Sequence, residues 1–256
     1  MSLSVLIAFA LLTGAAAYAQ TLTGFAFGLI TMSVIGLTGL LSLADAAVIV
    51  SILTLVNASQ MLLRGWKDVA WLQFGLVMAA SIPMLLVGYR LSKWLSADNA
   101  DLMRLILGLV IIVSSLQLAR KPHPLPKISN NGSFVFFGGI AGVLGGMFST
   151  AGPPLVYHFY RQPMPLVKIR ETLVTVFALN AVFRIGLVVV SGDLPSSSTL
   201  SALVAIPMVM GATYAARRWP PPLSTAAMKQ IVFFLLFLSG ISLGAPAIIH
   251  LSGLYP

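Results

Sequence analysis

Apolar segments of roughly the length needed to cross a lipid bilayer follow one another along almost the whole chain. A bilayer core about 30 Å thick requires about 20 apolar residues in a helix. Ten segments approach that length, and Gly, Pro or charged residues separate them. They lie near residues 3–19, 24–42, 45–63, 70–92 and 100–119, and near 134–149, 152–167, 171–190, 199–216 and 227–248. This pattern predicts an all-α integral membrane protein.

Composition excludes the other broad classes. Charged residues make up 8% of the chain and hydrophobic residues 58%, whereas a soluble domain carries about 25% charged residues. A soluble enzyme, a nucleic-acid-binding module and a disordered chain are therefore excluded. The net charge of +9 indicates basic cytoplasmic loops. The chain has no cysteine, and His123, His158 and His250 lack any ligand spacing, so we expect no metal and no cofactor.

The two halves of the chain repeat one another at an offset of 123 or 124 residues. Leu55-Val56-Asn57-Ala58 recurs as Ala178-Leu179-Asn180-Ala181, and Ile82-Pro83-Met84 recurs as Ile206-Pro207-Met208. Matches in order at a nearly constant offset indicate an internal repeat. We predict a first membrane repeat at 1–119, a proline-containing cytoplasmic linker at 120–132, and a second membrane repeat at 133–256.

Five segments per repeat is an odd number, so the second repeat is predicted to have inverted topology. The basic loops agree if the linker is cytoplasmic; they hold Arg64, Lys67, Lys168, Arg170, Arg217 and Arg218. The exceptions are Arg90 and Lys93, at the outer end, where long side chains can reach the interface. Both termini are then periplasmic and the chain lies in a bacterial cytoplasmic (inner) membrane.

The beginning of each repeat leaves two alternatives open. Its first two segments either both span the membrane or form a broken, re-entrant hairpin, and the inversion holds in either case. A cleaved signal peptide ending at Ala19 is disfavoured, because Met1-Ser2-Leu3-Ser4 carries no positive charge.

Each repeat opens with a polar, Gly-rich break, at 20–28 and at 145–154. Pro153 and Pro154 remove two backbone donors. Non-helical backbone is tolerated at membrane depth only where it is buried in protein or lines a cavity, and the free N–H groups of a broken helix suit an anion. The two breaks together predict a transporter's substrate site. Taken alone, the glycines of the second break fit close helix packing; they are Gly139, Gly142, Gly145 and Gly146.

At these residues the sequence resembles the TauE/SafE sulfite exporter family, also called the toluene sulfonate uptake permease group. The best match runs from Gly142-x-x-Gly145-Gly146 through Gly152-Pro153-Pro154, and the likeness covers nearly the whole chain. In the first motif, Gln20 to Thr23 replace the family's small, Gly-rich run. The resemblance implies transport of a small anion, typically sulfite or an organosulfonate, without specifying which.

Arg184 is the most informative single residue. It lies well inside the segment 171–190, where an unpaired charge costs about 2.5–3.5 kcal/mol on insertion scales. Asn180 precedes it by four residues and shares its helical face. A guanidinium can grip an oxyanion with two hydrogen bonds, so we expect both residues to bind the substrate. The alternative is a structural arginine held by helix-end carbonyls.

Further residues predicted to contact the substrate are small or neutral and polar: Asn57, Gln60, Gln20, Thr21, Thr23, Gly24, Ser149, Thr150 and Gly152. Either asparagine could instead cap a broken helix. His158 with Tyr157 is a candidate proton relay, the alternative being a histidine bonded to backbone near the interface.

The predicted function is secondary transport of a small organosulfur anion, such as sulfite or sulfoacetate, by alternating access. Export is favoured because an inside-negative potential drives anions outward, and because only Asp45 and Glu171 could carry a coupled proton. No Walker A pattern is present, and no constellation of acids and histidines supports an enzyme. An anion channel and a proton-coupled uptake permease stay open as alternatives, as does a homodimer. The expected partners are the anion and the lipid bilayer.

Overall fold

The described part of the chain is helical. The computed structural model describes residues 2–119 and 125–220, and residues 230, 234, 237, 238, 240–245 and 247. No strand occurs among these residues. The elements are α1 (Leu3–Thr23), α2 (Phe27–Thr38), α3 (Leu43–Gly65), η1 (Trp66–Asp68), α4 (Trp71–Asp98), α5 (Ala100–Ala119), α6 (Asn131–Phe148), α7 (Gly152–Tyr160), α8 (Leu166–Ser191), α9 (Ser197–Leu200), η2 (Ser201–Ala205) and α10 (Ile206–Arg218).

Five of these helices are long and apolar enough to cross a membrane: α1, α3, α4, α6 and α8. The class predicted from sequence, an all-helical membrane protein, is thereby confirmed. With 12 and 9 residues, α2 and α7 rise only about 18 and 14 Å, too little to span. Half of the predicted segment 227–248 lies outside the described residues.

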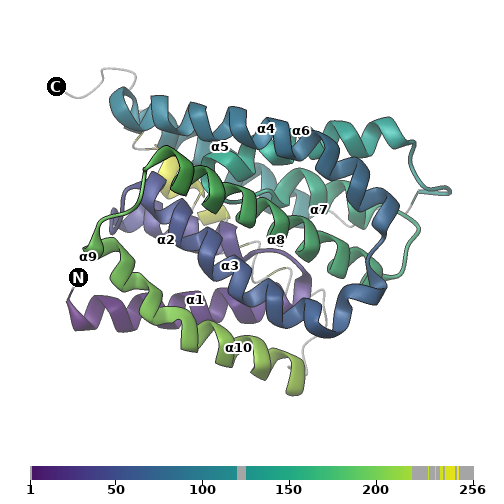
Figure 1. Cartoon of the computed structure of the whole chain (residues 1–256), viewed down its shortest axis with the longest axis horizontal. Helices are drawn as coiled ribbons and strands as arrows, with labels where there is room; N and C mark the ends of the chain where they lie inside the picture. Colours follow the sequence, from purple (N-terminus) through teal and green to yellow (C-terminus); the bar gives the residue numbers. More distant parts are fainter. Residues whose placement is uncertain are drawn as a thin grey trace.

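The helices pack in three pairs (Figure 1). α3 runs along α8 in the middle, α4 runs along α6 on one side of them, and α1 runs along α10 on the other. Each long helix that precedes a break, α1 or α6, is therefore paired with a helix from the other half of the chain. This pairing holds the two breaks near the middle of the molecule.

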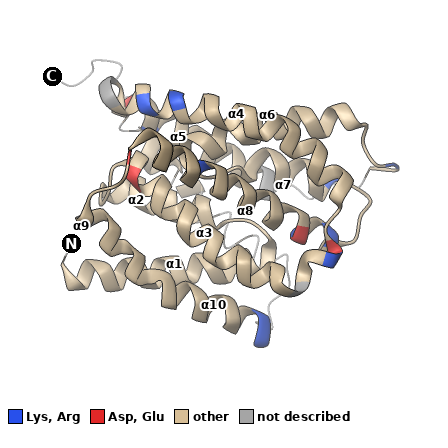
Figure 2. Cartoon of the chain, in the orientation of Figure 1, with Lys and Arg blue, Asp and Glu red and all other residues tan. Residues whose placement is uncertain are grey.

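Basic residues gather at one end of the bundle (Figure 2). η1, the start of α8 and the end of α10 meet there, beside residues 125–130. At the opposite end, Lys93 Nζ lies 2.7 Å from Asp193 Oδ2, and the Tyr89 hydroxyl donates to the same oxygen at 2.6 Å. The Lys93 ammonium and this hydroxyl hold the pKa of Asp193 below its usual range. Lys93, an exception to the expected distribution of basic residues, is thus offset by an acid.

Glycines allow α4 and α6 to touch backbone to backbone. A Cβ added at Gly142 or Gly146 would overlap the carbonyl oxygen of Ser81 or Leu85, respectively. A Cβ at Gly139 would make only ordinary contact with side chains of α4, and one at Gly145 would meet Ala151 and Asn180. Close packing, expected for all four glycines, therefore accounts for Gly142 and Gly146.

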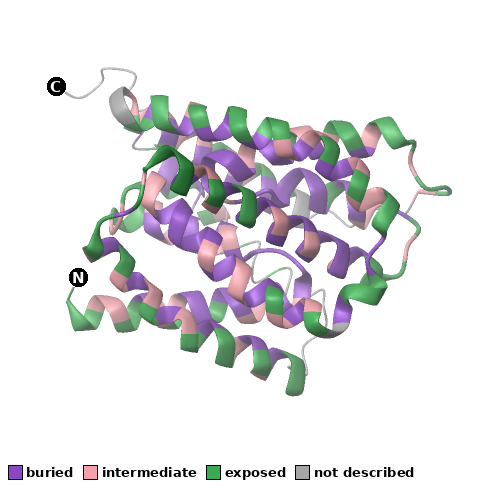
Figure 3. Cartoon of the chain, viewed as in Figure 1, coloured by how far each residue is buried: buried purple, intermediate pink, exposed green. Residues whose placement is uncertain are grey.

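The outer faces of α4 and α10 are exposed (Figure 3).

Gly142→Ala tests this packing. The added methyl must push α4 and α6 apart, and such overpacking costs about 1–3 kcal/mol. We expect a thermal midpoint in detergent lower by about 3–10 °C. Gly75→Ala is the matched control, because a Cβ at Gly75 in α4 meets nothing within 4 Å. Equal midpoints for the two variants would contradict the account.

Candidate functional site

The first break separates α1 from α2 by three residues. Gly24 and Ala26 both have left-handed backbone, with φ of 79° and 94°, a conformation that alanine adopts only under constraint. The Gln20 side chain supplies that constraint, since its Oε1 accepts the Phe27 N–H at 3.1 Å. Thr23 donates to the carbonyls of Ala19 and Phe25. Side chains of α1 thus hold the start of α2.

The second break separates α6 from α7. Ser149 is left-handed, with φ of 54°, and its hydroxyl lies 2.7 Å from that of Ser51 on α3. Pro153 and Pro154 occupy the first turn of α7, where a missing N–H costs no helical hydrogen bond. The chain therefore turns at Ser149 and restarts as a helix at Gly152.

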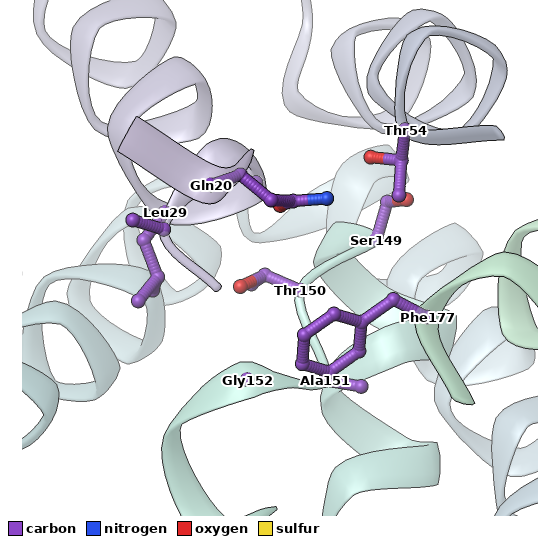
Figure 4. A pocket seen from close by; sticks show the side chains of 10 residues that line it. Gln20, Leu29, Thr54, Ser149, Thr150, Ala151, Gly152 and Phe177 are labelled. Atoms are coloured by element: carbon purple, nitrogen blue, oxygen red, sulfur yellow. The ribbon is translucent and has the colours of Figure 1, made fainter. Parts of the chain in front are cut away.

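The two breaks touch each other. A Cβ at Gly28 would lie 3.0 Å from the carbonyl oxygen of Ser149 and 3.2 Å from Thr150 Cβ, so a larger residue would require the two breaks to move slightly apart. The first turns of α2 and α7 consequently border one narrow cavity with a volume of about 20 Å³ (Figure 4). Its lining comprises Gln20, Ala26, Gly28, Leu29, Thr54, Ser149, Thr150, Ala151, Gly152 and Phe177.

A second cavity, of about 10 Å³, also borders the second break. It shares Ser149, Ala151 and Phe177 with the first cavity, and it adds Gly145, Asn180 and Ala181. Neither lining contains a charged side chain. We call the two together the crossing cavities.

Buried polar groups without partners line these cavities. Thr54 Oγ1 and Asn180 Nδ2 have no hydrogen-bond partner among the described residues, although the two residues are only 5% and 4% exposed. A buried unpaired polar group costs about 1–3 kcal/mol. The amide groups at the start of α2 add donors, because the first turn of a helix has no internal acceptor for them. The crossing cavities therefore offer donors to an acceptor-rich ligand.

Asn57, at the repeat position equivalent to Asn180, has the opposite environment. Its Oδ1 accepts from Gln20 Nε2 at 2.9 Å, and its Nδ2 donates to Thr21 and Thr213 at 3.1 and 2.7 Å. Asn57 lies outside the linings of the crossing cavities. It ties α3 to α1 and α10 through side chains, and these contacts do not cap a broken helix.

Arg184 is fully buried and bonded to backbone. Its Nη1 donates to the Gly146 carbonyl, its Nε donates to the Ala47 carbonyl at 3.4 Å, and its guanidinium lies over the Tyr89 ring at 5.5 Å. It lines neither crossing cavity. This is the geometry of the structural alternative, a cation that stabilises the C-terminal end of α6 just before the break.

The remaining predicted site residues lie partly at the crossing cavities and partly elsewhere. Ser149, Thr150, Gly152 and Gln20 line the crossing cavities. Thr21 lines a different cavity at the basic end, where Gly24 packs under Arg170. The Gln60 carbonyl accepts from Arg217.

The two candidates for a proton relay differ in exposure, since His158 is buried and Tyr157 is exposed. His158 Nε2 is 3.2 Å from the Ser133 hydroxyl, and its ring stacks on Phe137. The Tyr157 hydroxyl accepts from Arg161 at 2.7 Å. Neither residue lines the crossing cavities. Among the described residues no cluster of three or more His, Asp or Glu could hold a metal.

Sequence reasoning missed Thr54, Gly28 and Phe177. Thr54 and Phe177 stand three residues before Asn57 and Asn180, on the same helical faces, so the repeat could have identified both. Gly28 was within the predicted break, but its contact with the second break is a tertiary feature.

The sequence is similar to those of known membrane transport proteins. The family model "Sulfite exporter TauE/SafE" matches residues 7–243. The chain belongs to the TauE/SafE family. It is 38% identical over 237 residues to the "Probable sulfite/organosulfonate exporter TauE" of Cupriavidus necator, covering 93% of each chain. It is 29% identical over 184 residues to the "Probable inner membrane transporter protein TsaS" of Comamonas testosteroni, covering 70% of this chain and 74% of that one. No solved structure matches it.

The TauE/SafE match confirms the resemblance seen at the Gly-rich breaks. The protein is therefore a membrane transporter of this family. The relatives' names give no residue roles, so the roles argued for the crossing cavities rest on geometry.

Arg184→Gln tests the structural role of the buried arginine. Removing the guanidinium frees two buried carbonyls, at about 1–3 kcal/mol, and we expect a thermal midpoint lower by about 3–10 °C. Arg161→Gln is the control, because that arginine bonds only the exposed Tyr157 hydroxyl. An unchanged midpoint in Arg184→Gln would contradict the structural role and favour the predicted ligand contact.

Proposed function

We propose that this TauE/SafE protein is a secondary transporter that exports a small organosulfur anion, sulfite or an organosulfonate such as sulfoacetate. The anion binds where the two breaks cross. The observation that carries the proposal is the pair of buried donors without partners, on Thr54 and Asn180, beside two helix N-termini.

The chemistry of the crossing cavities suits such an anion. Sulfite and sulfonates present three oxygens that only accept hydrogen bonds. Thr54, Thr150 and Asn180 can each donate one, and the first turns of α2 and α7 contribute partial positive charge. No carboxylate in either lining repels the ligand. Neutral donors bind a permanent anion without the energetic cost of burying another full charge.

The packing of the helices supports an inverted pair of repeats, 1–119 and 133–256. α1 packs on α10 as α6 packs on α4, and α3 packs on its equivalent, α8. Such exchange between halves is expected of two units related by a twofold axis in the membrane plane. Rocking one repeat against the other would expose the crossing cavities to each side in turn.

The direction of transport follows from charge. We assign the basic end, with the linker, to the cytoplasm of a bacterial inner membrane, which places the start of α1 on the periplasmic side. The membrane potential then drives the anion outward at about 2.3 kcal/mol per charge and 100 mV. The name of the Cupriavidus necator relative supports export, and that of the Comamonas testosteroni relative supports the inner membrane.

Thr54→Val tests the site in proteoliposomes. The change removes a hydroxyl that has no hydrogen-bond partner in the described part of the chain, so stability is held or raised. Transport loses one hydrogen bond, about 1–2 kcal/mol, and we expect kcat/KM for radiolabelled sulfite to fall about 5- to 30-fold. Saturable counterflow in the wild type separates a carrier from a channel.

The matched control is Thr31→Val. Thr31 Oγ1 is also buried without a partner, but Thr31 lies outside both cavity linings. The kcat/KM of the Thr31→Val variant for radiolabelled sulfite should equal that of the wild type. Equal kcat/KM for Thr54→Val and the wild type would refute the proposed contact.

A further inference from the structure

A third cavity lies at the basic end of the bundle and contains charged side chains. It has a volume of about 240 Å³ and is lined by α1, α3, α8 and α10, with Thr21, Met61, Arg170, Glu171 and Arg217 among its residues. Neither crossing cavity shares its lining. We call it the basic-end cavity.

Glu171 in this cavity is buried but only half paired. The residue is 3% exposed, and Oε1 accepts from Arg170 Nε and Nη2 at 3.1 and 2.8 Å. Oε2 has no hydrogen-bond partner among the described residues. Gly65 on α3 makes room for it, since a Cβ there would overlap the carboxylate. A carboxylate held through one oxygen is bound less firmly than one held through both.

The two arginines lie on opposite walls of the basic-end cavity. The Arg170 side chain packs against Gly24 of the first break, where a Cβ would come within 2.7 Å of Arg170 Cγ. Among the residues that the structure describes, Arg217 donates to the Gln60 and Met61 carbonyls through Nη1, and the guanidinium has further N–H groups that can donate to a ligand. With Glu171, the three side chains carry a net charge of +1.

Neighbouring charges at this end increase the attraction for an anion. Lys67 belongs to η1, Lys168 to the start of α8 and Arg218 to the end of α10, and these segments meet at the basic end, where η1 also carries the acid Asp68 (Figure 1). Clefts lined by one sign of charge concentrate counter-ions.

We propose that the basic-end cavity is a second anion site, through which the substrate anion reaches the crossing cavities. The carboxylate of Glu171 competes there with the substrate anion for Arg170. This carboxylate occupies Arg170 in the resting state, and an incoming sulfite or sulfonate displaces it and bridges Arg170 and Arg217. The proposal rests on the proposed function, because it concerns the loading of the same anion.

The test is equilibrium binding of radiolabelled sulfite to the purified chain in detergent, at one pH so that sulfite has a constant charge. We expect the wild type to bind one sulfite tightly, at the crossing cavities, and a second at least tenfold more weakly. Glu171→Gln removes the competitor and should tighten the second site at least tenfold. Glu171→Gln combined with Arg170→Gln should abolish it.

Asp101→Asn is the control for net charge, because it neutralises the acid of another pair, Asp101 with Arg104, at a distance from the cavity. If the Glu171→Gln variant keeps the tight site and its second site binds sulfite no more tightly than in the wild type, the basic-end site is overturned. The proposed function is then left intact. Absence of both sites in every variant would overturn both proposals.

If Glu171→Gln does not fold, Arg217→Gln in the wild-type background tests the same site. In proteoliposomes, the KM of the Arg217→Gln variant for sulfite supplied on the side of the protein's basic end should rise at least threefold, while kcat stays the same. An unchanged KM would overturn the basic-end site.

Discussion

A helix interrupted inside a bilayer leaves backbone groups that have no water to bind, and this constraint organises the whole structure. Each interruption is held by side chains from a neighbouring segment. Gln20 Oε1 accepts from the first amide of α2, Arg184 donates to the Gly146 carbonyl just before the second break, and Ser51 bonds the hydroxyl of Ser149 at the turn itself. The helix pairs α1 with α10 and α4 with α6 then bring the two breaks together, so that Gly28 touches Ser149. The cavities at their crossing exist because both breaks are closed on their outer sides.

The two repeats use equivalent asparagines in opposite ways. α1 and α6 end 125 residues apart, at Thr23 and Phe148, so Gly145 stands where the first repeat has Gln20. Gln20 pairs with Asn57, whereas Gly145 offers Asn180 no side chain, and the amide nitrogen of Asn180 stays unpaired. One substitution thus makes the first half rigid and leaves a donor free in the second. This asymmetry suits a single small anion better than two symmetric sites would.

The sequence identified most of the architecture because bilayer thickness and Gly-Pro breaks are local signals. The segment at 45–63 became α3 at Leu43–Gly65, and both breaks fell where expected. Polar contacts were harder to predict, because they depend on which helices pair. Arg184 stood out as a buried cation, but its partner, the carbonyl of Gly146, is invisible to residue-type reasoning. Asn57 and Asn180 were identical in sequence terms, and only tertiary packing distinguished the bonded one from the open one.

The central claim is that a small oxyanion binds between the two breaks. Selenite has the shape and charge of sulfite, and the anomalous scattering of selenium locates it directly in a crystal of the protein soaked with it. We predict one strong anomalous peak within hydrogen-bonding distance of Thr150 and of either Thr54 or Asn180. A peak on Arg184, or no peak at the crossing of the breaks at saturating selenite, would contradict the account.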